Sequence, residues 1–408
     1  MELLEQNENI RIAFQYMNLA MLMQQLHYNL PLQKWEDNGA GDISLVNPVS
    51  MPVVTDDSTW HNKEQRVYGK WRPFQLAFVL MNLRAMYDRD CNERGIVDLA
   101  DPVSKYLPGF RNPVVCTADG KIEKAEREIL LEDIMNMTSG LTYGGTDETG
   151  RQTDALFQEV IHGLKEENGG TISTVEFANR LGKVPLLYQP GQSWSYGTSA
   201  DVVGAVIEVA SGMRFGDFLK KEIFEPLGMN DTDFWVPAEK QDRLAKVYDC
   251  REGQPSVRYL DNNLGIQNDM AYRPAYEAGG AGLASTIDDY AKFTQMLLNG
   301  GTYNGVQILR PTTVKFLGGH TLSAAQQAGF DNWIGLEGFS YGNLMRVLVD
   351  PTRAVTLGSK GEFGWDGWLG CYMEVVPEQN MTFLMMTQKK DAGTYTLSRK
   401  IRNIIFSE

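Results

Sequence analysis

The chain has 408 residues, of which 43% are hydrophobic and 22% charged, a composition typical of a globular protein that buries a sizeable core. Lys and Arg number 38 against 52 Asp and Glu, which gives a net charge of −14. A surface this acidic repels nucleic-acid phosphates and anionic lipid, and the sequence contains no basic run that would overrule it, so nucleic-acid binding is not expected.

The four cysteines and four histidines are scattered along the chain. None of them has the spacing of a metal-ligand set, so no metal and no other cofactor is predicted. The N-terminus is acidic where a secretory signal is basic, and no apolar run approaches the roughly 18 residues of a membrane span. We therefore expect a cytoplasmic protein without a membrane span. A signal removed beforehand would leave no trace here, and the oligomeric state is left open.

The N-terminal third predicts two helices separated by a polar segment. Residues 10–26 form an amphipathic pattern, and residues 28–66 are polar, with short strand candidates at 43–46 and 52–55. Residues 73–87 are apolar nearly all round, which is typical of a buried helix, and Pro73 suits its first turn.

The middle of the chain reads as helices joined by glycine- and proline-containing loops. Residues 96–110 predict a turn followed by a short helix. Residues 201–211 and 215–224 predict buried helices that end before Gly212 and Gly228.

From residue 279 the pattern changes to a helix at 286–298 followed by β-rich runs at 344–349, 369–376 and 381–387. Turn residues separate these runs, which indicates an antiparallel sheet. The fold class is therefore α/β, an antiparallel sheet flanked by helices with an inserted helical lobe. We expect residues 1–65 and 270–408 to form the sheet subdomain, residues 66–269 to form the lobe, and the pocket of this single functional unit to lie between them.

Six sequence blocks occur in an order and spacing that resemble one known superfamily. They are residues 96–110, NMTSGL at 136–141, PGQSWSYGTSADVVG at 190–204, FEPLGMNDT at 224–232, GGAGLASTIDDYAKF at 279–293 and GEFGWDG at 361–367. Together they resemble the serine β-lactamase and penicillin-binding protein-like superfamily, in particular class C β-lactamases and their esterase relatives. The resemblance covers about residues 66–400 and implies the β-lactamase/transpeptidase-like fold.

The resemblance also implies a chemistry. In this superfamily a serine at the start of a buried helix attacks an acyl carbon, and a lysine one turn later helps to remove its proton. A tyrosine from the helical lobe is the second proton carrier, and backbone N–H groups hold the oxyanion. Tyr196 matches that tyrosine, and the N–H of Trp368, after Gly367, matches the oxyanion donor on the sheet edge.

The chain departs from the superfamily at the nucleophile itself. The Ser-x-x-Lys-Pro pattern aligns on residues 69–73, where Gly69 stands in place of the serine and Arg72 in place of the lysine. Glycine has no atom to acylate, and arginine stays protonated and cannot act as a base. No Ser-x-x-Lys occurs anywhere in the sequence. Whether Gly69 and Arg72 are natural or engineered is left open.

Several residues follow as site candidates from this alignment. Tyr196 is either an acid/base or a packing tyrosine with one hydrogen bond. Arg72 is either an electrostatic stabiliser that clamps an anion or one half of an internal ion pair. Gly69 contributes a backbone N–H at the nucleophile position. The candidate substrate-binding residues are Lys70, Trp71, Thr198, Glu362, Trp365, Asp366, Gly367 and Trp368.

The sequence thus predicts a β-lactamase-like protein that has lost the acyl-enzyme chemistry. Its old pocket binds a small anionic or carbonyl-containing molecule, or carries out a different reaction on it. Two alternatives stay open, a pseudoenzyme with a structural or interaction role and a divergent residual esterase or β-lactamase-like hydrolase.

Overall fold

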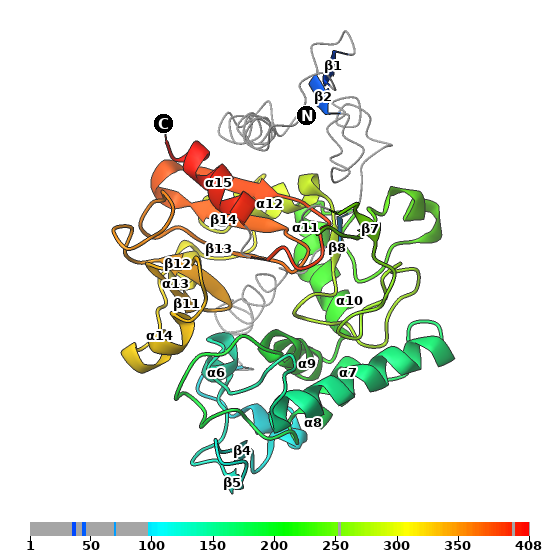
Figure 1. Cartoon of the computed structure of the whole chain (residues 1–408), viewed down its shortest axis with the longest axis vertical. Coiled ribbons are helices and arrows are strands. Elements are labelled where there is room, and N and C mark those ends of the chain that lie inside the picture. The colour runs from blue at the N-terminus through cyan, green and yellow to red at the C-terminus, as the bar shows by residue number, and fades with distance from the viewer. Residues whose placement is uncertain are drawn as a thin grey trace.

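The computed structural model describes residues 35–37, 43–45, 69–70, 97–251, 254–393 and 396–407 (Figure 1). Strands β1 (Trp35–Asp37) and β2 (Ile43–Leu45) form an antiparallel pair, and β2 confirms the strand predicted at 43–46. The elements predicted at 10–26, 52–55 and 73–87 lie outside the described residues.

A five-stranded antiparallel sheet is built in chain order from the C-terminal part of the protein. Its strands are β11 (Phe339–Gly342), β12 (Met345–Leu348), β13 (Phe363–Asp366), β14 (Tyr372–Val376) and β15 (Met381–Met385). A two-residue turn with positive φ at Asn343 and Leu344 joins β11 to β12, as tight hairpins require. Strands β12, β14 and β15 confirm the three predicted strands.

Helices cover both faces of this sheet. Successive residues of a strand point to opposite faces, so each strand contributes side chains to both layers. On one face, Tyr372 and Val376 pack against Leu397 and Ile401 of α15 (Thr396–Ile405). On the other face, Met373 and Val375 join the main core with residues of α12 (Ile287–Leu298). Figure 1 shows α12 and α15 beside the sheet, and α6 to α9 gathered at the opposite end of the molecule.

The helical lobe contains α6 (Leu131–Met135), α7 (Glu148–Glu166), α8 (Thr174–Leu181) and α9 (Ser199–Ser211). The side chains of Asp147 and Ser173 accept hydrogen bonds at the N-termini of α7 and α8. Helix α9 ends at Gly212, whose φ of 68° only glycine adopts readily, as predicted. Helix α10 (Phe215–Leu219) continues through a π-helical turn (Lys220–Phe224) into α11 (Glu225–Leu227), which stops at Gly228.

Shorter elements complete the described chain. Four of them are 3-10 segments (Val103–Lys105, Pro108–Phe110, Ala238–Arg243 and Pro377–Gln379). The short strands pair as β4 (Val114–Cys116) with β5 (Ile122–Lys124), β6 (Tyr248–Asp249) with β7 (Val257–Arg258), and β9 (Thr302–Tyr303) with β10 (Val306–Gln307). The remaining helices are α13 (Pro311–Leu317) and α14 (Ala324–Phe330). Strand β3 (Gly69–Lys70) pairs with β8 (Ala284–Ser285). The architecture is the predicted antiparallel sheet with flanking helices and a helical lobe; the subdomain boundaries remain a prediction.

Candidate active site

Tyr196 lies on the loop that leads into α9, and a second family block holds this loop in place. The backbone N–H of Ser195 donates to the carbonyl of Met137 at 3.0 Å. A Cβ on Gly197 would stand 2.2 Å from the carbonyl oxygen of Leu141, so only glycine fits this close approach. The blocks at 136–141 and 190–204 therefore form one structural unit that fixes the backbone around Tyr196.

A hydrogen bond links the hydroxyl of Tyr196, on the loop before α9, to a residue of the five-stranded sheet. The indole Nε1 of Trp365, on β13, donates to this hydroxyl at 3.2 Å. The two rings lie 5.4 Å apart. The sequence-predicted Tyr196 and Trp365 are thus brought together by segments 169 residues apart in the chain.

A cluster of aromatic rings surrounds this pair. Tyr143 lies 5.5 Å from Tyr196 between ring centroids, and Trp333 meets Tyr196 edge-on at 5.2 Å. Such edge-on and tilted contacts contribute beyond the area they bury. Trp333 also contacts Trp194 and Trp365, so this half-exposed ring packs within the same aromatic cluster.

The third family block divides between the two faces of the sheet. Trp365 pairs with Met373 and belongs to the core that faces the lobe, whereas Asp366 pairs with Tyr372, on the face covered by α15. Asp366 is buried and its carboxylate lies 3.4 Å from the guanidinium of Arg346. Asp366 therefore has a charged partner inside the protein, and substrate binding by Asp366 stays a prediction.

Glu362 also has a charged partner inside the protein. Its side chain is 0% exposed and pairs with the guanidinium of Arg402 on α15 at 2.5 Å. Burial and the nearby charge of Glu374 raise the pKa of Glu362 to about 8, while Arg402 acts in the opposite direction. Glu362 therefore belongs to an internal ion-pair network, and substrate binding by Glu362 stays a prediction.

Gly367 and Trp368 follow β13 in a tight turn. The N–H of Gly367 donates to the carbonyl of Cys371 at 2.8 Å, so it is engaged in the turn itself. The indole of Trp368 donates through Nε1 to Asp391 and meets Tyr259 edge-on at 5.7 Å. The Trp368 ring thus points toward the loops around Tyr259, and an oxyanion role for its backbone N–H stays a prediction.

Thr198 lies two residues after Tyr196 in the chain, and its side chain is buried. Its side chain is 0% exposed, and its Oγ1 has no hydrogen-bond partner within the described ranges. The neighbouring Ser199 instead shares a hydrogen bond of 3.2 Å with Ser139. The hydroxyls of Ser139 and Ser199 hold the two family blocks together, and substrate binding by Thr198 stays a prediction.

The segment predicted to align with the family's nucleophile motif is described only in part. Gly69 and Lys70 are extended and pair with Ser285 and Ala284 in antiparallel register. Trp71 and Arg72 lie outside the described residues. Their place in the pocket therefore stays a prediction.

The described residues hold no group of three or more His, Cys, Asp or Glu that could bind a metal ion. In the same part of the chain, no helix is long and apolar enough to cross a membrane.

Sequence reasoning missed Tyr143 and Trp333 as neighbours of Tyr196. Tyr143 follows the NMTSGL block by two residues, a proximity that offered a signal. Trp333 sits on the loop after α14, outside every family block, and only the tertiary fold reveals its position.

Comparison with known proteins identifies the family of the chain. The chain is 29% identical over 307 residues to Protein Rv1367c of Mycobacterium tuberculosis, covering 72% of each chain. It is also 29% identical over 334 residues to Esterase EstB of Burkholderia gladioli, covering 78% of each. Among solved structures, EstCE1, a hydrolase with promiscuous acyltransferase activity, shares the fold with a TM-score of 0.64 at 21% identity, over 84% of this chain and 85% of that one. The beta-lactamase family model matches residues 90–404, and the chain therefore belongs to the beta-lactamase family.

Proposed function

We propose that this protein binds a small carbonyl-containing, anionic molecule beside Tyr196 and Trp365 and forms no acyl-enzyme with it. The proposal rests on one observation: the family's tyrosine is held in place, but the family's nucleophile motif is missing. Tyr196 and Trp365 are hydrogen-bonded at 3.2 Å, yet the sequence contains no Ser-x-x-Lys. Gly69, which aligns with the family serine, has no side chain that could be acylated.

The surroundings of Tyr196 support binding of an organic ligand. The rings of Tyr143, Trp333 and Trp365 pack around Tyr196, and ligand sites are commonly lined by aromatic side chains with a few placed polar groups. The Tyr196 hydroxyl is the polar group that a carbonyl oxygen would meet. Arg72 would supply the donors for a carboxylate.

Incubation with a fluorescent penicillin, followed by gel fluorescence and intact-mass measurement, tests the missing nucleophile. We expect no mass increase, because Gly69 offers no oxygen to the β-lactam carbonyl. A serine β-lactamase treated in parallel shows that an adduct would be detected. A stable acyl adduct on any residue of this chain would overturn the proposal.

The second candidate function is a residual esterase. The relatives named as an esterase and as a hydrolase favour it, as does the intact Tyr196–Trp365 pair. It requires turnover of a p-nitrophenyl ester that falls in Tyr196→Phe. Ester hydrolysis at the same rate as in buffer excludes this candidate.

The anion-binding part of the proposal rests on Arg72. N-acetylglycine, which carries one carbonyl and one carboxylate, is expected to raise the melting temperature of the wild type. Because a hydrogen bond to a charged group contributes roughly 1.5–3 kcal/mol, Arg72→Met should weaken binding at least about tenfold. Arg111→Met, at an exposed arginine that follows the 3-10 turn Pro108–Phe110, is the matched control and should bind as the wild type does. Equal affinity in Arg72→Met and the wild type would rule out Arg72 as the anion site.

A further inference from the structure

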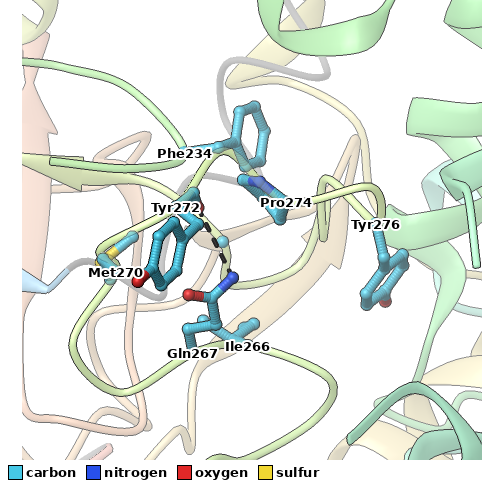
Figure 2. A pocket seen from close by; sticks show the side chains of 8 residues that line it. Phe234, Ile266, Gln267, Met270, Tyr272, Pro274 and Tyr276 are labelled. Carbon is cyan, nitrogen blue, oxygen red and sulfur yellow. Dashed lines mark hydrogen bonds between the residues drawn. The ribbon is translucent and has the colours of Figure 1, made fainter. Parts of the chain in front are cut away.

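The two pockets beside Gln267 are too small for an organic ligand. Figure 2 shows the first of them, where Gln267, Tyr272 and Tyr276 are among the residues that enclose about 10 Å³. The second, next to Trp368, has a volume of about 20 Å³. Since one buried water needs about 10–15 Å³, each pocket has room for a water molecule or two, and neither offers a second ligand site.

The turn between β11 and β12 is bound to the helical lobe where the NMTSGL block begins. The N–H of Leu344 donates to the carbonyl of Met135, the last residue of α6, at 2.7 Å. The N–H of Asn343 donates to the side-chain Oδ1 of Asn136 at 3.1 Å. This turn therefore joins the five-stranded sheet to the block that holds the loop of Tyr196.

His320, on the loop after α13, is the third member of this contact. Its Nε2 lies 3.0 Å from Nδ2 of Asn136. The orientation of this amide is fixed, because its Oδ1 accepts the N–H of Asn343 and its Nδ2 therefore faces the ring. An amide Nδ2 only donates, so Nε2 of His320 has to accept, which requires the neutral ring with its proton on Nδ1.

Neighbouring groups hold the His320 ring in this position. A Cβ on Gly342 would stand 2.6 Å from the His320 Cδ2, so a larger residue there would displace the ring. The Phe316 ring meets it edge-on at 5.9 Å. The chain that follows is bound to β11, because the N–H of Leu322 donates to Oγ of Ser340 at 3.0 Å. A protonated ring held in this way would direct one N–H group against another.

The surroundings of His320 also favour the neutral ring. Burial lowers the pKa of His320 below its ordinary value, while the charge of Glu132 on α6 acts in the opposite direction. The other acid of α6, Asp133, is paired with Arg127 at 2.6 Å. Lys315 of α13 is exposed, and the residues of the β11–β12 turn are uncharged.

We propose that His320 is a pH-sensitive latch between the sheet and the helical lobe. The neutral ring accepts the Asn136 amide and stabilises the β11–β12 turn on α6, and a proton on Nε2 breaks this contact and loosens the turn. The latch goes beyond the proposed function and needs no ligand. Histidine in an unfolded chain titrates near about 6.5, so the folded state binds fewer protons than the unfolded state just below this pH. The stabilisation is therefore complete above about pH 6.5 and is lost as the pH falls through the lower pKa of the folded state.

NMR of the full chain with histidine labelled at Cε1 follows the titration of each imidazole. The signal that is absent in His320→Gln identifies His320, and in the wild type we expect it to titrate below about 6.5. Asn136→Asp retains an acceptor for Asn343 but turns a carboxylate oxygen toward the ring. In this variant the pKa of His320 should rise above about 6.5, because the negative charge favours the protonated ring.

Hydrogen exchange read by mass spectrometry reports the release of the turn. After correction for intrinsic rates, a peptide containing Asn343 and Leu344 should be roughly two- to tenfold less protected at pH 5 than at pH 7.5, the equivalent of one net hydrogen bond. In His320→Gln this difference should vanish, because the glutamine carbonyl accepts from Asn136 and does not titrate. His162→Gln removes an exposed histidine of α7 and is the matched control, which should behave as the wild type does.

Three results would each overturn the latch. The first is a wild-type His320 that titrates at or above about 6.5, and the second is turn protection that depends on pH in His320→Gln as it does in the wild type. The third is a His320 pKa in Asn136→Asp no higher than in the wild type, since the amide would then not be the group that faces the ring. If His320→Gln does not fold, the histidine signal that moves in Asn136→Asp identifies His320 instead.

Discussion

Arg402→Met is expected to lower the free energy of unfolding by about 3–5 kcal/mol, the cost of breaking a buried ion pair on one side. Arg402 is 3% exposed and lies on α15, the last helix of the described chain. All five of its N–H groups are engaged by protein oxygens. The acceptors are Glu362, Glu374, the Tyr372 hydroxyl, the Leu357 carbonyl and the Thr356 hydroxyl.

The loss is large because methionine would leave two buried carboxylates behind. Glu362 and Glu374 are both 0% exposed, and Arg346, the nearby second arginine, already lies beside Asp366.

Urea unfolding at neutral pH measures this effect. Lys400→Met, at an exposed position of the same helix, is the control and should change stability by less than about 0.5 kcal/mol. Adding Glu362→Gln and Glu374→Gln to Arg402→Met removes the stranded charges and should recover part of the loss. A loss in Arg402→Met no larger than in Lys400→Met would show that the network does not stabilise the fold.

Much of the fold could be predicted because its signals are local. The helix ends at Gly212 and Gly228 depend on one residue each, and the strands β12, β14 and β15 follow from short β-rich runs between turns. The family blocks likewise predicted that Tyr196 would lie near the third motif, where Trp365 binds it.

The direction of individual side chains could not be predicted, because it depends on strand register and on distant partners. Glu362 and Asp366 occur in the same block as Trp365, but their acceptor atoms face Arg402 and Arg346 from other elements. Neither arginine stands in a family block. A buried charge network therefore cannot be predicted from a single sequence, whereas a glycine that ends a helix can.

Asp201→Asn is expected to stabilise the protein at pH 7.5, and Asp201→Ala to destabilise it. Asp201 lies in the first turn of α9 and is 2% exposed. Its Oδ1 accepts from the Tyr276 hydroxyl at 2.7 Å and from the Gly280 N–H at 3.2 Å, while its Oδ2 is buried with no hydrogen-bond partner in the described ranges. Through Gly280, this carboxyl ties the helix after Tyr196 to the glycine-rich turn that precedes β8.

The direction in which stability changes with pH follows from the number of protons bound by Asp201 in the folded and unfolded states. Burial raises the pKa of Asp201 to about 6, although the hydrogen bonds from Tyr276 and Gly280 favour the charged form. In the unfolded chain the same carboxyl ionises near pH 4. Between these values the folded state binds more protons than the unfolded state, so stability falls as the pH rises from about 4 to 6 and then levels off. Two pKa units correspond to roughly 3 kcal/mol.

Asparagine retains an acceptor for Tyr276 and Gly280 but carries no charge, so Asp201→Asn should equal the wild type near pH 4 and exceed its stability by up to roughly 3 kcal/mol at pH 7.5. Alanine leaves both donors buried without an acceptor, which costs roughly 1–3 kcal/mol for each at either pH. Urea unfolding of the three proteins at pH 4 and pH 7.5 distinguishes the contributions of charge and hydrogen bonding. If Asp201→Asn were as unstable as Asp201→Ala at pH 7.5, the folded protein would have to stabilise the ionised carboxylate, and the position of Asp201 would be one that requires a negative charge.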